Sequence, residues 1–333
     1  MEISVAMCTY NGEHYIEQQI KSILSQTKLP DEIVVCDDGS TDNTLQIIND
    51  LAKKTHVPIR VFENKTNLGF IQNFQQALTL CNGDLIFLSD QDDEWVKDKI
   101  DTIVHYFQEQ QHLEVVFTNA ILKRNEVLTD IRLWDVVGFN AFELKHCQTS
   151  KGLLSRFLIN SNVATGATMA LKKSFVKASF PLFDSPNYFH DYLFAMQGAV
   201  NGTLAFIETP LIYYRIHEAQ TAGLDESDKK RITIKLLIRK LVGKKWQSNL
   251  GDLISKENLL RHLIEHASSQ APQKNIDYVV RMLEHYESRK KIINKMWPLN
   301  MFHAFKEYLS GRYKLSYTNK RDRLKFFLKD IIT

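Results

Sequence analysis

Four carboxylates fall within five residues, directly after a short apolar run. The run is residues 85–88, and the carboxylates are Asp90, Asp92, Asp93 and Glu94. A continuous apolar run of this length is typical of a strand that is buried on both faces of a parallel sheet. Negative charge gathered at the end of such a strand repels itself unless a cation binds there. Mg²⁺ and Mn²⁺ take oxygen ligands, and Mg²⁺ commonly uses one or two carboxylates together with substrate phosphates.

A plainer interpretation is an acidic turn whose last carboxylates cap a helix that begins near Trp95. We prefer this interpretation for Asp93 and Glu94. Asp90 and Asp92 project from the end of the buried strand, and ligands of open α/β sheets bind beyond the carboxyl ends of strands. For these two residues we therefore predict metal and phosphate binding.

The residues before this stretch alternate between short apolar runs and apolar residues at helical spacing. This order predicts a parallel sheet wrapped by helices through right-handed crossovers, with the turns after the strands meeting at one edge. No G-x-G-x-x-G or Walker motif follows the first strand, so a metal rather than a glycine-rich loop would neutralise a nucleotide's phosphates. The expected strands are residues 2–8, 33–36, 59–62 and 85–88.

Length and composition fit one large domain with an appendage. The chain has 333 residues, of which 44% are hydrophobic and 24% charged, an ordinary globular composition. Its four cysteines are far apart and form no C-x-x-C pair, which favours a reducing compartment and no zinc site. We find no signal peptide and no uninterrupted apolar stretch of about 18 residues. These features predict a cytoplasmic protein.

Four motifs occur in a fixed order along the first third of the chain. They are Thr9-Tyr10-Asn11-Gly12, Asp37-Asp38-Gly39-Ser40-Thr41-Asp42, Asn67-Leu68-Gly69 and Asp90-Gln91-Asp92-Asp93-Glu94-Trp95. Together they resemble the motifs of family 2 glycosyltransferases of the GT-A fold, and the resemblance covers roughly residues 1–220. It implies an α/β, Rossmann-like and mostly parallel sheet flanked by helices.

The resemblance also implies roles for individual residues. Tyr10 and Asp38 would hold the nucleobase and ribose of a nucleotide-sugar donor, although Tyr10 could instead be a core aromatic at a strand end. Asp92, the last carboxylate of the D-x-D motif, would bind Mg²⁺ or Mn²⁺ on the donor diphosphate. The full set of expected donor-binding residues is Thr9, Tyr10, Asn11, Asp38, Asn67, Gly69 and Asp90.

The second half of the predicted domain would bind the acceptor. Gly166 stands in an expected turn before a strand and permits a close approach of substrate. Asp191 follows His190 in the first turn of a predicted helix, among aromatic residues that would raise its pKa, a useful property for a general base. It could also be a helix N-terminal aspartate favoured by the macrodipole. The resemblance assigns Asp191 as the base and places His190 on the acceptor side.

Two segments are harder to interpret. Residues 120–160 lack periodicity and could form binding loops or a helical insertion. Residues 211–217 read as the last strand, and their Tyr-Arg-x-His block resembles the rhamnosyltransferase-like branch of the family. His217 could contact the metal or diphosphate, or it could be purely structural. Arg215 could pair with one of the carboxylates at the sheet edge.

Charge divides the chain into an acidic body and a basic tail. Residues 1–224 hold 18 Lys and Arg against 27 Asp and Glu, whereas residues 225–333 hold 24 against 12. We predict a catalytic domain over residues 1–224, with a nucleotide-sugar half to about residue 112 and an acceptor half over 113–224. Residues 225–333 should form a basic helical region.

The basic region predicts an anionic partner. Residues 232–246 and 320–332 combine apolar and basic sides, which suits helices lying on the inner face of the cell membrane. These helices could instead pack on the catalytic domain or form a homodimer. The acidic body opposes a nucleic-acid partner.

The sequence therefore predicts an inverting, metal-dependent glycosyltransferase. The preferred donor is dTDP-rhamnose and the acceptor a hydroxyl of a bacterial cell-surface polysaccharide or lipid-linked glycan. The alternatives are a UDP-hexose transferase, a nucleotidyltransferase or a non-catalytic glycan-binding or nucleotide-binding module. A nucleotidyltransferase would usually carry a glycine-rich loop after the first strand, and a binding module would be expected to lack the carboxylates present here.

Overall fold

The computed structural model describes most of the chain. It divides into two compact units, Met1–Ala219 and Gln220–Thr333, and each is presented here by itself. The predicted amphipathic segment at residues 232–246 lies almost entirely outside the described part, and most of the segment at 320–332 does too. The described residues are 1–124, 126–159, 162–184, 188–217, 246–293 and 299–316, with residues 323, 324, 327 and 330.

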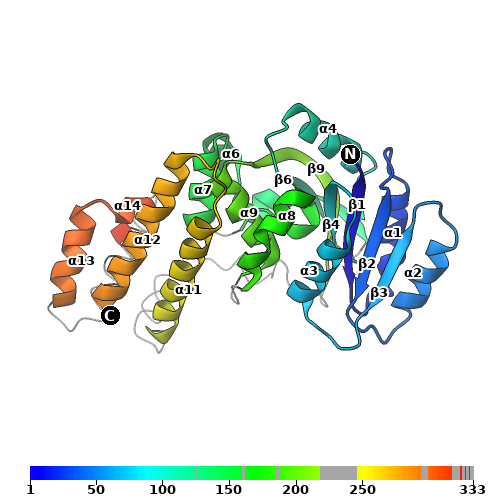
Figure 1. Cartoon of the computed structure of the whole chain (residues 1–333), viewed down its shortest axis with the longest axis horizontal. Helices are drawn as coiled ribbons and strands as arrows, with labels where there is room; N and C mark the ends of the chain where they lie inside the picture. The colour runs from blue at the N-terminus through cyan, green and yellow to red at the C-terminus, as the bar shows by residue number, and fades with distance from the viewer. Residues whose placement is uncertain are drawn as a thin grey trace. The chain divides into compact units, whose positions relative to one another are not determined.

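The first unit begins with alternating strands and helices. The strands β1, β2 and β4 are almost wholly buried, as their apolar runs predict. Helices α1 and α2 lie on one side of the sheet and α3 on the other (Figure 1). The elements are β1 (Ile3–Thr9), α1 (Ile16–Leu24), β2 (Glu32–Asp37), α2 (Thr44–Ala52), β3 (Ile59–Glu63), α3 (Phe70–Leu80) and β4 (Leu85–Ser89).

The second half of this unit extends the same sheet. Residues 120–160 hold a strand end, a further strand and three helices, so the helical alternative for this region is correct. The elements are β5 (Glu94–Trp95), α4 (Lys99–Glu109), β6 (Val115–Arg124), β7 (Val127–Arg132), α5 (Leu133–Val136), α6 (Ala141–His146), α7 (Ser150–Ile159), η1 (Gly166–Thr168), β8 (Met169–Lys172), α8 (Lys173–Ser179), η2 (Phe180–Asp184), α9 (His190–Asn201) and β9 (Leu204–Ile216).

The strand order is β3-β2-β1-β4-β8-β6-β9-β5, with β7 paired to β6. The pairs β1–β2, β1–β4, β2–β3 and β6–β9 are parallel, and the other four are antiparallel. The GT-A fold class is confirmed, but the sheet is mixed rather than mostly parallel. The reason is that β8 runs antiparallel between β4 and β6, which no local pattern in the sequence indicates.

This topology brings several loops to one edge. Strands β1, β2, β4, β6 and β9 all end at the same edge, which we call the carboxyl edge, because the reversals at β4–β8 and β6–β8 cancel. The turn η1 lies at this edge as well, since it immediately precedes β8. The predicted site residues therefore come from segments that share one edge of the sheet.

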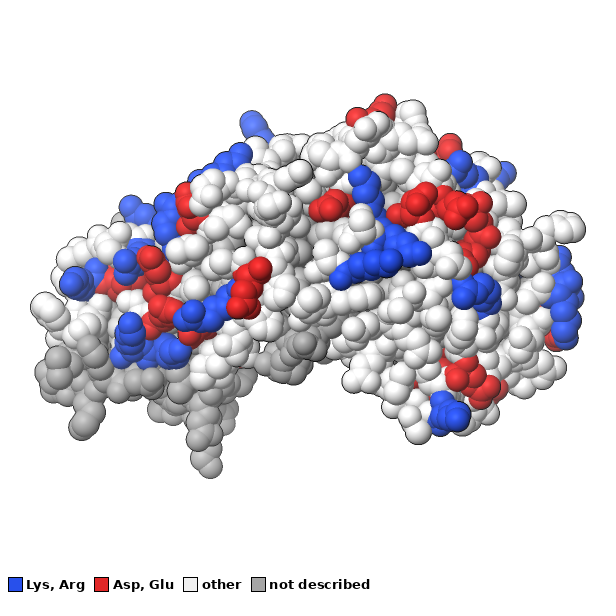
Figure 2. Space-filling model, viewed as in Figure 1, with Lys and Arg blue, Asp and Glu red and all other residues white. Residues whose placement is uncertain are grey.

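The second unit is helical where it is described. Helix α12 (Gln273–Ile293) packs against α11 (Trp246–Glu265), α13 (Leu299–Leu309) and α14 (Tyr313–Ser316). No described helix combines the length and apolar character needed to cross a bilayer. On the face drawn in Figure 2, each unit carries acidic and basic side chains interspersed.

Candidate active site

Asp38 is held in place by the loop that precedes α3. Its carboxylate accepts hydrogen bonds from the backbone N–H groups of Leu68 (2.7 Å) and Gly69 (2.9 Å), and from the Asn64 side chain at 2.9 Å. Gly69 has φ 77°, a conformation that favours glycine. The Asn67 amide donates weakly to the Asp38 carbonyl at 3.3 Å. The second and third motifs thus form one rigid unit around a buried carboxylate.

The polar residues beneath this unit stabilise the loop after β2. Asp37 is fully buried and accepts hydrogen bonds from the Thr9 hydroxyl (2.7 Å) and from the backbone N–H of Ser40 (2.7 Å). Asn11, with φ 47°, accepts from the backbone N–H of Thr41 at 2.8 Å. The side chains of Thr9 and Asn11, both predicted to bind the donor, are thus engaged in holding this loop.

Tyr10 is an aromatic residue at the sheet edge that is 48% exposed. Its backbone is fixed by Gln91, which accepts from the Tyr10 N–H at 2.8 Å and donates to the Tyr10 carbonyl at 3.0 Å. Gly12 allows this clamp, since a Cβ there would lie 2.3 Å from the Gln91 Oε1. The first and fourth motifs are therefore joined, and the Tyr10 ring remains accessible to a ligand.

The acidic loop, residues 90–94, gathers negative charge after β4. Burial and the charges of Asp92 and Asp191 raise the pKa of Asp90 to about 7. Burial and the nearby Asp92 and Asp90 also raise the pKa of Asp93, whose Oδ2 is buried without a hydrogen-bond partner. A cation would relieve this repulsion.

One histidine faces this loop. The Nε2 of His217 lies 2.8 Å from the Oδ2 of Asp92, and its ring packs on Tyr15 with 4.6 Å between centroids. The described residues contain no preformed cluster of three or more histidine, cysteine or carboxylate groups able to hold a metal. The Asp92 carboxylate is an oxygen ligand of the kind that Mg²⁺ and Mn²⁺ take beside phosphate and water, and His217 would add an imidazole nitrogen, a ligand that divalent transition metals accept.

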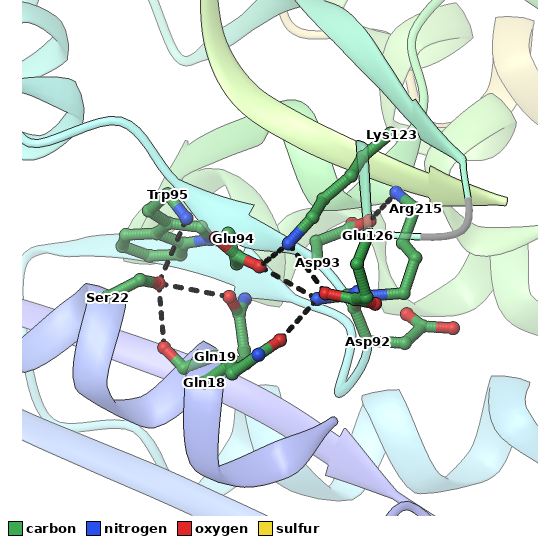
Figure 3. A network of polar contacts seen from close by, with 10 residues as sticks. All are labelled: Gln18, Gln19, Ser22, Asp92, Asp93, Glu94, Trp95, Lys123, Glu126 and Arg215. Carbon is green, nitrogen blue, oxygen red and sulfur yellow. Dashed lines mark hydrogen bonds and ion pairs between the residues drawn. The ribbon is translucent and has the colours of Figure 1, made fainter. Parts of the chain in front are cut away.

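The expectation that Asp93 and Glu94 cap a helix is wrong. Helix α4 begins only at Lys99, and Glu94 lies in the short strand β5, paired with β9. Asp93 instead accepts the backbone N–H of Arg215 at 3.0 Å. Arg215 pairs with Glu94 at 2.8 Å, which confirms its predicted contact with a carboxylate of the edge (Figure 3).

Asp191 stands in the first turn of α9. Its carboxylate accepts the backbone N–H groups of Tyr192 (2.6 Å) and Gly166 (3.1 Å). Burial raises its pKa to about 6, although these hydrogen bonds act in the opposite direction. The negative charge of Asp191 also contributes to the raised pKa of Asp90, after burial and Asp92.

His190 and Gly166 pack close together next to this carboxylate. The His190 ring stacks on Phe74 of α3 with centroids 4.3 Å apart, and burial lowers its pKa to about 4. Both of its ring nitrogens are buried without a hydrogen-bond partner. A Cβ at residue 166 would lie 3.1 Å from the His190 Nε2, so a larger residue there would press on the imidazole ring.

Sequence reasoning missed two supporting residues. Asn73 lies on the buried face of α3, where it accepts from Asn64 at 2.9 Å and donates to the Cys36 carbonyl at 2.9 Å. Lys99 is fully buried and donates to the Ala167 carbonyl at 2.7 Å, and burial lowers its pKa to about 7. A polar residue on the apolar face of a predicted helix was the available signal for both.

The sheet is mixed, and the loops that carry the acidic motif and the predicted nucleotide-binding motifs follow neighbouring strands at one edge. This arrangement is typical of the GT-A fold. The model of glycosyl transferase family 2 matches residues 4–177, which is more than half of the chain. The chain therefore belongs to glycosyl transferase family 2 and is a glycosyltransferase.

Similar proteins agree with this assignment, and a solved structure agrees with the fold. An uncharacterized glycosyltransferase of Haemophilus influenzae is 29% identical over 228 residues, 67% of this chain and 68% of the relative. The dTDP-rhamnosyl transferase RfbG of Shigella flexneri is 25% identical and covers 89% of this chain and 98% of its own length. The crystal structure of S. aureus TarS in complex with UDP covers 86% of this chain and 91% of its own, with 20% identity and a TM-score of 0.50, a likeness of fold.

Proposed function

We propose that this glycosyltransferase is inverting and metal-dependent, and that it moves a sugar from a nucleoside diphosphate to an acceptor hydroxyl. The observation that carries the proposal is the placement of Asp191, which the backbone N–H groups of Tyr192 and Gly166 hold in the first turn of α9. Burial raises its pKa to about 6, so this group is ionised at neutral pH and remains basic enough to accept a proton. In this proposal the acidic loop binds the donor diphosphate and Asp191 faces the acceptor.

In the proposed reaction, Asp191 accepts the proton of the acceptor hydroxyl. The hydroxyl oxygen attacks the anomeric carbon on the face opposite the diphosphate. The new glycosidic bond forms as the bond from the anomeric carbon to the phosphate oxygen breaks, and the configuration inverts. The backbone N–H of Gly166 donates to the Asp191 carboxylate and would hold it in place for this proton transfer.

The donor side would be built from the carboxyl-edge loops. Asp38 is fixed by two backbone N–H groups and could accept a hydrogen bond from the nucleoside, while the exposed Tyr10 ring could stack on the base. Asp92 and His217 would hold the metal, with Asp90 nearby. A bound Mg²⁺ or Mn²⁺ would supply positive charge that stabilises the departing diphosphate.

For the donor we propose dTDP-rhamnose, and for the acceptor a bacterial cell-surface or lipid-linked glycan. The likeness to RfbG, which extends over nearly the whole of that protein, and the Tyr-Arg-x-His block support this choice. A UDP-hexose is the second candidate. It is supported by 28% identity, over 66% of this chain and 80% of the relative, to the Escherichia coli UDP-Glc:alpha-D-GlcNAc-diphosphoundecaprenol beta-1,3-glucosyltransferase WfaP.

A panel of nucleotide sugars tests the proposal. With Mn²⁺ present, dTDP-rhamnose should raise the melting temperature of the full chain more than UDP-glucose, UDP-galactose or UDP-N-acetylglucosamine. Binding of a ligand to the folded state alone produces such a shift. A larger shift with a UDP sugar would replace the rhamnose donor by the second candidate. No shift with any nucleotide sugar would contradict the proposed chemistry.

A further inference from the structure

Arg215 contacts three other segments of the first unit, although only 2% of its side chain is exposed. Its Nε donates to the backbone carbonyl of Asp92 at 2.7 Å, and its Nη2 donates to the side chains of Gln18 (2.7 Å) and Glu94 (2.8 Å). Its Nη1 forms an ion pair with Glu126, just before β7. Figure 3 shows these groups converging on the guanidinium from α1, the acidic loop and the β6–β7 connection.

The charges in this cluster balance. Lys123 of β6 is 9% exposed, and its ammonium forms ion pairs with Glu94 and, at 2.9 Å, with Glu126. Two cations therefore face two carboxylates. Arg215 donates to the backbone carbonyl of Asp92 and, through its own backbone N–H, to the Asp93 carboxylate, while the Asp92 carboxylate meets His217. Both cations of the cluster therefore have carboxylate partners other than Asp92.

An unconstrained arginine at this position would behave differently. Arginine forms strong, often bidentate bonds with carboxylates. Arg215 already contacts the backbone carbonyl of Asp92, so the carboxylate of the same residue would be an alternative partner for its guanidinium. We propose that Arg215 is a positioning residue, and that Glu94 and Glu126 hold its charge away from the Asp92 carboxylate so that this group stays available to a metal. This inference rests on the metal site of the proposed function.

Glu126 is the residue through which the idea is best tested. Its side chain is 54% exposed, against 25% for Glu94, so a substitution there leaves no buried cavity or unpaired buried carboxylate. Glu126→Gln keeps the shape and removes the charge that faces Arg215. Asp130 lies on the neighbouring strand β7 and is exposed, so Asp130→Asn is a control that removes the same charge nearby.

The experiment is calorimetric titration of Mn²⁺ into the full chain with saturating dTDP, and in parallel with UDP. Glu126→Gln should weaken Mn²⁺ binding about threefold or more, a size typical of losing one partly exposed ion pair. Asp130→Asn should change it by less than about 1.5-fold on the same basis. Glu126→Gln keeps an oxygen that can accept from Arg215, so its melting temperature should fall only slightly. A large fall with unchanged Mn²⁺ affinity would mark a merely structural role.

A double variant separates repositioning of Arg215 from simple loss of a nearby negative charge. In an Arg215→Gln background, Glu126→Gln should have no further effect on Mn²⁺ binding, whereas a simple charge effect would persist. In one contrary outcome, Glu126→Gln binds Mn²⁺ with the affinity of the native chain, and in another its affinity shows the same small change as that of Asp130→Asn. Either result would overturn the role of Glu126 and leave the proposed function intact. If the native chain binds no Mn²⁺ with either nucleotide, the metal-dependent function fails and this inference fails with it.

Discussion

Replacement of Asp191 by asparagine should abolish most activity without destabilising the chain. Loss of a general base lowers turnover by about 10²-fold or more. Donor binding should be nearly unchanged, because the donor-side residues lie on other segments. The pH dependence adds a second test. With a pKa of about 6, only about a tenth of the Asp191 side chains are ionised at pH 5, whereas nearly all would be with the ordinary pKa of 3.8.

The stability effect follows from the same shift. Because the pKa of Asp191 is raised in the folded state, the folded chain holds a proton that the unfolded chain releases, so stability rises as the pH falls from about 6 to about 4. Above pH 6 the ionised side chain costs at most about 3 kcal/mol, and less because it is partly exposed. Asparagine removes this cost. Its NH₂ group would face one of the two backbone N–H donors, however, and the loss of that hydrogen bond lowers the stability by about 1 kcal/mol.

The assays are steady-state transfer between pH 4.5 and 8 and thermal unfolding at pH 7. The native chain should lose activity as the pH falls through about 6, and Asp191→Asn should melt no lower than the native chain. Asp101→Asn, an exchange of an exposed residue on α4, serves as a control for general effects of charge loss. Near-native transfer by Asp191→Asn would refute the assignment of the base. An acid limb near pH 4 would refute the effect of burial on its pKa.

Three further results are expected. Asp92→Ala should leave the fold intact and weaken Mn²⁺-dependent binding of dTDP or UDP; calorimetry that gives equal affinity with and without metal in the native chain would contradict the metal role. Gly12→Ala should displace Gln91, because the Gln91 Oε1 would lie 2.3 Å from the new Cβ, and should thereby weaken nucleotide binding. Gly251→Ala is the control, since a Cβ there meets nothing within 4 Å, and it should weaken binding less. The full chain should sediment with anionic liposomes at low salt and dissociate from them at high salt. The reason is that the exposed residues Phe302, Phe305 and Leu309 of α13 lie within a basic region of the sequence. A version ending at Gly223 that still sediments would place the membrane contact elsewhere.

The sequence by itself determined the first half of the fold and the order of its motifs. Apolar runs of strand length separated by helical spacing predicted β1 to β4, because the period of apolar residues reports which faces are buried. The same pattern placed the loops after β1, β2 and β4 at one edge. The type of residue in these loops, rather than any contact, then indicated nucleotide and metal chemistry.

Only the tertiary structure decided which polar groups act together. Glu94 is 121 residues from Arg215, and its place in a short strand beside β9 rather than at a helix start depends on a pairing with no local signal. The bonds from Leu68 and Gly69 to Asp38 likewise join separate loops. The raised pKa of Asp191 arises from burial among distant segments, which sequence could anticipate in direction alone. Local patterns specify periodicity and turns, whereas desolvation and ion pairing depend on segments that meet only after the sheet has formed.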